Sequence, residues 1–266
     1  MEGKYVLEVC NPRGVRESKI QGLTAPRLKS LDGKKIAILG ALPESIPFNF
    51  ALEKALQAKF PTAKVVYRQT GMDGEKNLEF LKDFDAFIDG VRLSGGWQTE
   101  PPVVYEKAGI PGVHLCLETM RPQAVFSMLS HGLPTLRIVS IPALMWINAE
   151  NKAENFPPIA EYMADEIVRA LTEPLTEEEK NPPPCDFDFG NLFFEGKDYD
   201  EAYKKCQEYF VGHAMTDSLP IVPPTPEAVE AMLAGTSRDK NEVIGIMQPG
   251  RGIVTIEKVA VNAVMA

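Results

Sequence analysis

Short apolar runs alternate with amphipathic stretches from residue 30 to residue 172. Continuous runs of Val, Ile, Leu and Ala that are separated by helical patterns are typical of a parallel sheet covered on both faces. The runs with the length of buried strands are 35–41, 64–68, 85–91, 112–117 and 136–141. We therefore predict an α/β fold with a doubly wound, mostly parallel, Rossmann- or flavodoxin-like sheet.

Two of the stretches between these runs carry apolar residues at three- and four-residue steps. In 48–60, the side chains of Phe48, Leu52 and Leu56 share one side of the predicted helix. The stretch 158–171 repeats the pattern, and its prolines stand in the first turn, where a helix accepts them. Both helices should pack one face on the sheet.

The composition changes between residues 175 and 197, where three consecutive prolines interrupt regular helix. We predict that this linker separates a domain of residues 1–174 from a mainly α module of residues 198–266. The last predicted helix, 256–266, carries several valines that nothing in the sequence shields. We therefore expect an incomplete chain, or a homo- or hetero-oligomer that forms through this helix.

Charge and composition exclude several classes of protein. The formal net charge of −9, with Lys and Arg scattered along the chain, disfavours nucleic acid as a partner. Neither a signal peptide nor a run of about 18 apolar residues occurs, so we expect no membrane association. The cysteines at 10, 116, 185 and 206 lack the spacing of a zinc site. A reduced, cytoplasmic protein without a bound metal fits these features.

Ligands of open parallel sheets bind at the carboxyl ends of the strands, where loops diverge and helices begin. The loops predicted at that edge are 40–47, 90–97, 118–122 and 142–148. The first of them has neither the GxGxxG nor the GxxxxGK pattern, so no nucleotide cofactor is indicated. We expect a small-molecule substrate there, and the sequence identifies no cofactor.

Cys116 ends the predicted strand 112–117 and is the first candidate for a reactive thiol. His114, two positions earlier, should share its face of the sheet and bring an imidazole near the sulfur. The competing interpretation is that the cysteine is a small buried apolar residue and the histidine a structural one. Glu118 follows at the same edge, and Arg137 is a candidate for binding an anionic substrate.

Two polar residues stand out in the C-terminal module. Asp217 lies in a Thr-Asp-Ser sequence before Leu219 and Pro220, and is a candidate for substrate binding or for a helix cap. Asn262 lies among alanines and valines, where its amide needs hydrogen-bond partners. We expect Asn262 to meet a partner segment or the substrate pocket.

The loop after the third predicted strand carries the most informative motif, Ser94-Gly95-Gly96-Trp97. Its two glycines allow backbone amides to approach an anion or a carbonyl group. The chain resembles the UGSC family, in which a Gly-Val-Gly-Asp-(Sec/Cys)-Gly-Ser-Cys motif aligns with residues 90–97. The resemblance extends over about residues 5–172 and is carried by LDGKKIAILG (31–40), EKAGIPGVHLC (106–116) and GLPTLRIVSIP (132–142).

The resemblance implies thiol or selenol redox chemistry, but Ser94 and Trp97 replace both redox residues. Ser94 is a nucleophile only beside a base, and the family's dithiol cycle is not available. Our first hypothesis is an enzyme that acts on a small, anionic organic molecule at the loops that carry Ser94, Cys116 and Arg137. Ser94, Cys116 and His114 are its candidate catalytic residues, and Gly95, Gly96, Trp97 and Arg137 belong to its candidate substrate site. The second is a non-catalytic subunit that positions a catalytic partner. The third is a flavodoxin-like flavin protein in which Trp97 stacks on the flavin.

Overall fold

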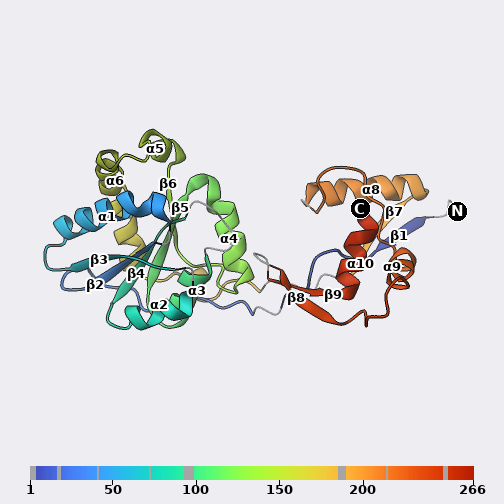
Figure 1. Ribbon diagram of the computed structural model, residues 1–266, viewed down its shortest axis with the longest axis horizontal. Coiled ribbons are helices and arrows are strands. Elements are labelled where there is room, and N and C mark those ends of the chain that lie inside the picture. The colour runs from blue at the N-terminus through green and yellow to red at the C-terminus, as the bar shows by residue number, and fades with distance from the viewer. Residues whose placement is uncertain are drawn as a thin grey trace. The chain divides into compact units, whose positions relative to one another are not determined.

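The computed structural model describes residues 4–16, 19–40, 42–71, 73–92, 99–184, 190–213, 215–247 and 251–266. The chain divides into two compact units (Figure 1). The larger unit comprises residues 18–185, and the smaller comprises residues 1–17 together with residues 186–266. The sequence grouped residues 1–17 with the larger unit, because nothing local in them reveals their distant partner strand.

The larger unit is built on a five-stranded sheet with the order β3-β2-β4-β5-β6. Its strands are β2 (Lys35–Gly40), β3 (Lys64–Gln69), β4 (Ala86–Arg92), β5 (Gly112–Leu117) and β6 (Ile138–Ile141). Each neighbouring pair of strands is parallel. The predicted doubly wound α/β fold is confirmed, and each predicted strand falls within two residues of an observed one.

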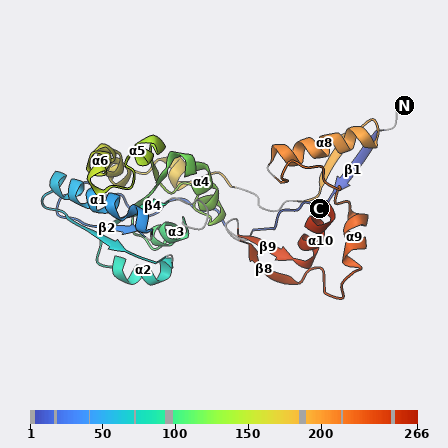
Figure 2. The same ribbon diagram turned by 45° about the horizontal axis from the view of Figure 1, so that its top comes forward.

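Helices cover both faces of this sheet (Figures 1 and 2). One face carries α1 (Ile46–Lys59) and α6 (Pro157–Thr172), which bury Phe48, Leu52 and Ile167 against the alternate strand residues Ile36 and Ile38. The other face carries α2 (Gly74–Leu81), α3 (Glu100–Lys107) and α4 (Arg121–Ser130). Shorter elements are η1 (Pro43–Ser45), η3 (Glu118–Met120), α5 (Ala143–Asn148), η4 (Ala153–Asn155) and α7 (Glu177–Lys180).

The strand order reverses between β2 and β4. From β2 the chain moves outward to β3, and then crosses back over β2 to form β4, β5 and β6. The carboxyl ends of β2 and β4 therefore form the topological switch point, where ligands of open α/β sheets bind.

The short helix α7 lies within the predicted linker, 175–197, but it belongs to the larger unit. The carbonyl of its Glu179 accepts a hydrogen bond from Leu23 N.

The smaller unit combines helices with short antiparallel strands (Figure 2). β1 (Tyr5–Val9) pairs with β7 (Leu192–Gly196), and β8 (Val243–Met247) pairs with β9 (Gly252–Thr255). Its helices are α8 (Tyr199–Gly212), α9 (Pro226–Leu233) and α10 (Ile256–Met265). The sequence predicted the helices but not the strands, because β1 pairs with a segment more than 180 residues away.

The apolar side of α10 is covered inside the smaller unit. Val261 and Val264 pack against Val229 of α9, and Met265 packs in a cluster with Leu7 and other residues around β1, β7 and α8. The expectation of an oligomer through this helix rested on unshielded valines, and of these Val259 alone is exposed among the described residues. No helix of the described chain is both long and apolar enough to span a membrane.

Candidate functional site

A buried acid and a buried imidazole meet on the two central strands of the larger unit. Asp89 on β4 is the register partner of His114 on β5, and both side chains face the α3 side of the sheet. His114 Nδ1 lies 2.6 Å from Asp89 Oδ2. The exposed fractions of the two side chains are 1% and 0%. Two ionisable groups are thus held together away from water.

The contact has a consequence for the imidazole tautomer. A carboxylate beside Nδ1 favours the tautomer with the proton on Nδ1, which leaves Nε2 as the basic nitrogen. A histidine held in this way can accept a proton through Nε2 and return it, as a general base and acid does.

Cys116 follows two residues later on β5 and is 1% exposed. It is the register partner of Ser140 on β6. Burial raises the pKa of the Cys116 thiol, while a hydrogen bond with Ser140 and the charge of Arg121 oppose the rise without cancelling it. Cys116 is therefore a neutral thiol near pH 7, which supports the structural interpretation of this cysteine over the nucleophilic one.

Arg121, the first residue of α4, brings a positive charge to the same strands. Its Nη1 donates to Ile138 O and to Ser140 Oγ, both at 3.1 Å. A groove of about 510 Å³ beside β6 is lined by Arg121 together with basic and acidic residues of α6 and α7. The sequence analysis did not single out Arg121, although it stands in the predicted carboxyl-edge loop 118–122.

The predicted motif Ser94-Gly95-Gly96-Trp97 lies outside the described residues. The described chain stops at Arg92, the register partner of Cys116, and resumes at Thr99, whose hydroxyl donates to Ser127 Oγ on α4. The register of β4 against β5 shifts between Asp89 and Arg92. Such β-bulges are frequent beside active sites, where they redirect side chains.

Glu118 stands at the carboxyl end of β5, as predicted. Its side chain is exposed, and Oε1 accepts a hydrogen bond of 3.1 Å from Ala143 N, at the start of α5. The structure therefore places Cys116 and Glu118 at the carboxyl end of β5 and in its following turn, whereas His114 lies two residues further into the strand.

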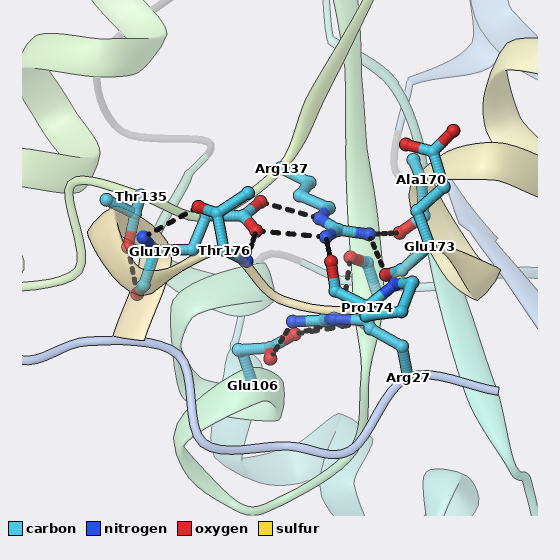
Figure 3. Close-up of polar contacts among 10 residues, drawn as sticks. Arg27, Glu106, Thr135, Arg137, Ala170, Glu173, Pro174, Thr176 and Glu179 are labelled. Atoms are coloured by element: carbon cyan, nitrogen blue, oxygen red, sulfur yellow. Dashed lines mark hydrogen bonds and ion pairs between the residues drawn. The ribbon is translucent and has the colours of Figure 1, made fainter. Parts of the chain in front are cut away.

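Arg137 lies at the opposite edge of the sheet, because it immediately precedes the first residue of β6. Its five N–H groups all donate to protein oxygens (Figure 3). Two of these bonds reach the carboxylate of Glu179, at 2.7 and 3.0 Å. The others reach the carbonyls of Ala170, Glu173 and Pro174. The guanidinium holds α7 against the end of α6, which accounts for Arg137 without a substrate.

A second buried pair, Arg27 with Glu106, lies beside Arg137 at this amino edge (Figure 3). Glu106 Oε2 also accepts a hydrogen bond of 3.0 Å from Gly112 N, at the start of β5. Burial raises the pKa of Glu106, and the nearby Arg27 reduces the rise without reversing it. For Glu179, burial is outweighed by hydrogen bonds from Arg137 and Thr176, and the pKa is lowered. These pairs fasten the amino edge of the sheet.

Asp217 and Asn262 belong to the smaller unit, where contacts within that unit account for each. Asp217 is exposed and accepts a hydrogen bond from Leu219 N at 3.0 Å, as in a turn. Asn262 Nδ2 donates to Pro12 O at 3.1 Å and to Lys258 O at 2.8 Å. Asn262 also lines an apolar groove of about 530 Å³. The side chain is exposed, and both of its hydrogen bonds reach backbone carbonyls of the smaller unit.

Sequence reasoning missed Asp89, the partner of His114. The signal was present, because an aspartate in the middle of the apolar run 85–91 needs a buried partner. Among the described residues, no three His, Cys, Asp or Glu side chains form a group that could hold a metal ion.

The comparison with protein families gives one match over most of the larger unit. The model of the UGSC family matches residues 8–173, more than half of the chain. This range contains all five strands of the parallel sheet and the Asp89–His114 pair. No curated protein matches the chain.

Proposed function

Since the chain belongs to the UGSC family, we propose that it is an enzyme that acts on a small anionic organic molecule at the carboxyl edge of the parallel sheet. His114 is the general base and acid of this reaction, and Asp89 orients its ring. The observation that carries the proposal is the 2.6 Å contact between His114 Nδ1 and Asp89 Oδ2 in a fully buried pair.

The energetics of burial support a functional role for this pair. Removing two ionisable groups from water is costly, and well-packed apolar residues of similar volume are often as stable or more so. Asp89 and His114 lie between strands whose neighbouring core positions are apolar, such as Phe87 and Leu115. Since apolar residues would serve the stability of the fold as well, the presence of an imidazole–carboxylate pair at this position favours a role in catalysis.

The proposed chemistry differs from the thiol or selenol redox reactions that the family motif implies. Ser94 and Trp97 occupy the positions of the two redox residues, and Cys116 is a buried neutral thiol. The proton that His114 accepts comes from the substrate in an isomerisation or elimination, or from a nucleophilic hydroxyl in an acyl transfer, for which Ser94 is the candidate that the sequence offers. In both cases His114 Nε2 takes the proton and later returns it.

The position of Arg121 favours a substrate with a negative charge. It is an exposed cation at the carboxyl end of β5, and its Nη1 contacts Ser140, the hydrogen-bond partner of Cys116. The guanidinium has five donors in a planar fork that matches a carboxylate. Arg121 replaces Arg137 in the proposed site, since all five donors of Arg137 are used within the protein.

The test compares the purified full chain with its His114→Asn variant. Each is incubated with a small-molecule cell extract, and the compounds consumed are followed by mass spectrometry. We expect the wild type to consume at least one small organic acid, and His114→Asn to do so at least about 100-fold more slowly. His213→Asn, which changes an exposed histidine of the smaller unit, is the matched control. Equal consumption by wild type and His114→Asn contradicts the proposal.

A non-catalytic subunit is the second candidate, and the raised pKa of the buried Cys116 thiol favours it. With Ser94 and Trp97 in the motif, no described or aligned residue supplies a redox-active sulfur at this edge. The same experiment separates the two candidates. A folded wild type that consumes nothing from the extract supports the subunit and overturns the enzyme.

A further inference from the structure

Asn49 of α1 is a buried amide at the switch point between β2 and β4. Its side chain is fully buried, and Nδ2 donates to Ser45 Oγ at 3.3 Å. Among the described residues, its Oδ1 has no hydrogen-bond partner. A buried carbonyl oxygen without a partner is rare and calls for an explanation.

The amide lies against two glycines on neighbouring strands. A Cβ atom on Gly90 of β4 would lie 2.7 Å from Asn49 Oδ1 and 2.8 Å from the carbonyl oxygen of Leu39. A Cβ atom on Gly40 of β2 would overlap Asn49 Nδ2. The amide of Asn49 therefore occupies the space of two side chains and contacts both strands where they end.

One of these glycines is the residue that follows Asp89. The register between β4 and β5 is regular up to the Asp89–His114 pair and shifts before Arg92. Asn49 thus packs on the backbone at the point where β4 departs from regular pairing. The Asp89 side chain lies on the α3 side of the sheet, whereas Asn49 contacts Gly90 from the α1 side. Asn49 therefore does not touch the carboxylate and can affect its position only through the backbone of β4.

We propose that Asn49 is a positioning residue that holds the β4 backbone at Gly90, so that the Asp89 carboxylate meets His114 Nδ1. Its catalytic meaning rests on the proposed function, whereas the positioning itself is a property of the folded chain. Asn49 Oδ1 lies 2.7 Å from the place that a Cβ of Gly90 would take, next to the Cα of that glycine. A carbonyl oxygen beside a Cα–H group can form a weak hydrogen bond that an apolar side chain of similar size does not provide.

The Tyr67 hydroxyl lies near this amide. Burial raises the pKa of Tyr67, and the proximity of Asn49 opposes the rise, although the two side chains form no hydrogen bond in the structure. Asn49 is therefore held by Ser45 and by its contacts with Gly40 and Gly90, and a change at Asn49 acts first on the two strands.

The experiment observes the ring of His114 directly and needs no substrate. The full chain is labelled with ¹⁵N in its histidines, and the ring nitrogens and the proton between Nδ1 and Asp89 are recorded by NMR at one fixed pH. The chain has three histidines, so His131→Asn and His213→Asn variants assign the signals. In the wild type we expect the Nδ1-protonated tautomer, with a low-field proton shared with the Asp89 carboxylate.

In the Asn49→Leu variant we expect this proton signal to shift or vanish, and the Nδ1-protonated tautomer to fall at least about twofold. Asn49→Ala, which removes the amide without adding bulk, is measured in parallel in case the leucine variant does not fold. The control is Asn77→Leu, which removes an amide that bonds Gly71 and Tyr105 elsewhere in the same unit.

Unchanged His114 signals in a folded Asn49 variant overturn the inference. The two proposals fail separately. An altered ring in Asn49→Leu without any consumed compound in the extract keeps the positioning role and rejects the enzyme. If the wild type consumes a compound and His114→Asn does not, while the His114 ring signals are unchanged in the Asn49 variants, the enzyme is supported and the positioning role is rejected.

Discussion

His114 Nδ1 and Asp89 Oδ2 lie 2.6 Å apart between adjacent parallel strands, with both side chains fully buried. Replacing Asp89 by Asn keeps the shape of the side chain but removes the carboxylate that contacts Nδ1. We expect Asp89→Asn to lower the free energy of unfolding by about 1.5–3 kcal/mol, measured by urea denaturation at pH 7.

The matched control for this change is Asp83→Asn, which alters an exposed aspartate three residues before the start of β4. Its effect should stay within about 0.5 kcal/mol. An Asp89→Asn protein as stable as the wild type would mean that the pair contributes nothing to the fold, and that its geometry is not maintained by the contact.

The described cysteines should differ in their reaction with iodoacetamide. Cys10 is half-buried, whereas Cys116 and Cys206 are buried. Burial raises the pKa of Cys206 to about 11, and it also raises those of Cys116 and Cys10, so the expected difference in rate rests mainly on the access of the reagent to the sulfur. We expect Cys10 to be alkylated at least about tenfold faster than the other two at pH 7.5, as followed by peptide mass spectrometry. Rapid alkylation of Cys116 in the folded chain would restore it as a nucleophile.

The sheet could be predicted from the sequence because its strands are buried on both sides. Apart from Lys35 and His114, the runs 35–41 and 112–117 hold no charged or strongly polar residue, and the observed strands β2 and β5 match them to within one residue. Local composition was enough, because each strand is followed by a helix that the same window of sequence reveals. The family resemblance, now confirmed over residues 8–173, was carried by the same segments.

What the sequence did not reveal depends on residues that are distant along the chain. Arg137 looked like a substrate ligand, but its partner Glu179 lies 42 positions later in a short helix. β1 was assigned to the wrong unit for the same reason, since it pairs with β7 near residue 194. The Asp89–His114 pair needed the parallel register of β4 and β5, which composition does not encode.

The two glycines beside Asn49 should respond differently to substitution. A Cβ on Gly40 meets the side chain of Asn49 first, whereas a Cβ on Gly90 also meets the backbone oxygen of Leu39 at 2.8 Å. We expect both Gly40→Ala and Gly90→Ala to destabilise the protein by about 1–3 kcal/mol. Adding Asn49→Ala should recover at least half of the loss for Gly40→Ala and much less for Gly90→Ala.

Double-mutant cycles based on urea denaturation measure this difference, because the coupling energy isolates the contact with Asn49. Gly33→Ala serves as a control of another kind. At Gly33 a Cβ would meet no atom within 4 Å, but the backbone has φ = +69°, so its cost is conformational and independent of Asn49. Equal rescue of Gly40→Ala and Gly90→Ala would show that the Leu39 carbonyl does not restrict the strand.

The ion pair of Glu179 with Arg137 makes the stability of the fold depend on pH, and the shifted pKa of Glu179 gives the direction of this dependence. Its pKa in the folded chain is lowered from an ordinary value of 4.5. The unfolded chain therefore binds a proton at a higher pH than the folded one, and the stability from the ionised group is complete above the unfolded value. That stability is lost as the pH falls through the folded value.

At pH 7, Glu179→Gln should lower the free energy of unfolding by about 1–3 kcal/mol, because Arg137 loses its charged partner. The difference from the wild type should shrink steadily below about pH 4.5 in urea denaturation. Glu178→Gln, an exposed neighbour in α7, should show no such trend. A constant difference between pH 7 and pH 3 would mean that Glu179 acts through packing and not through its charge.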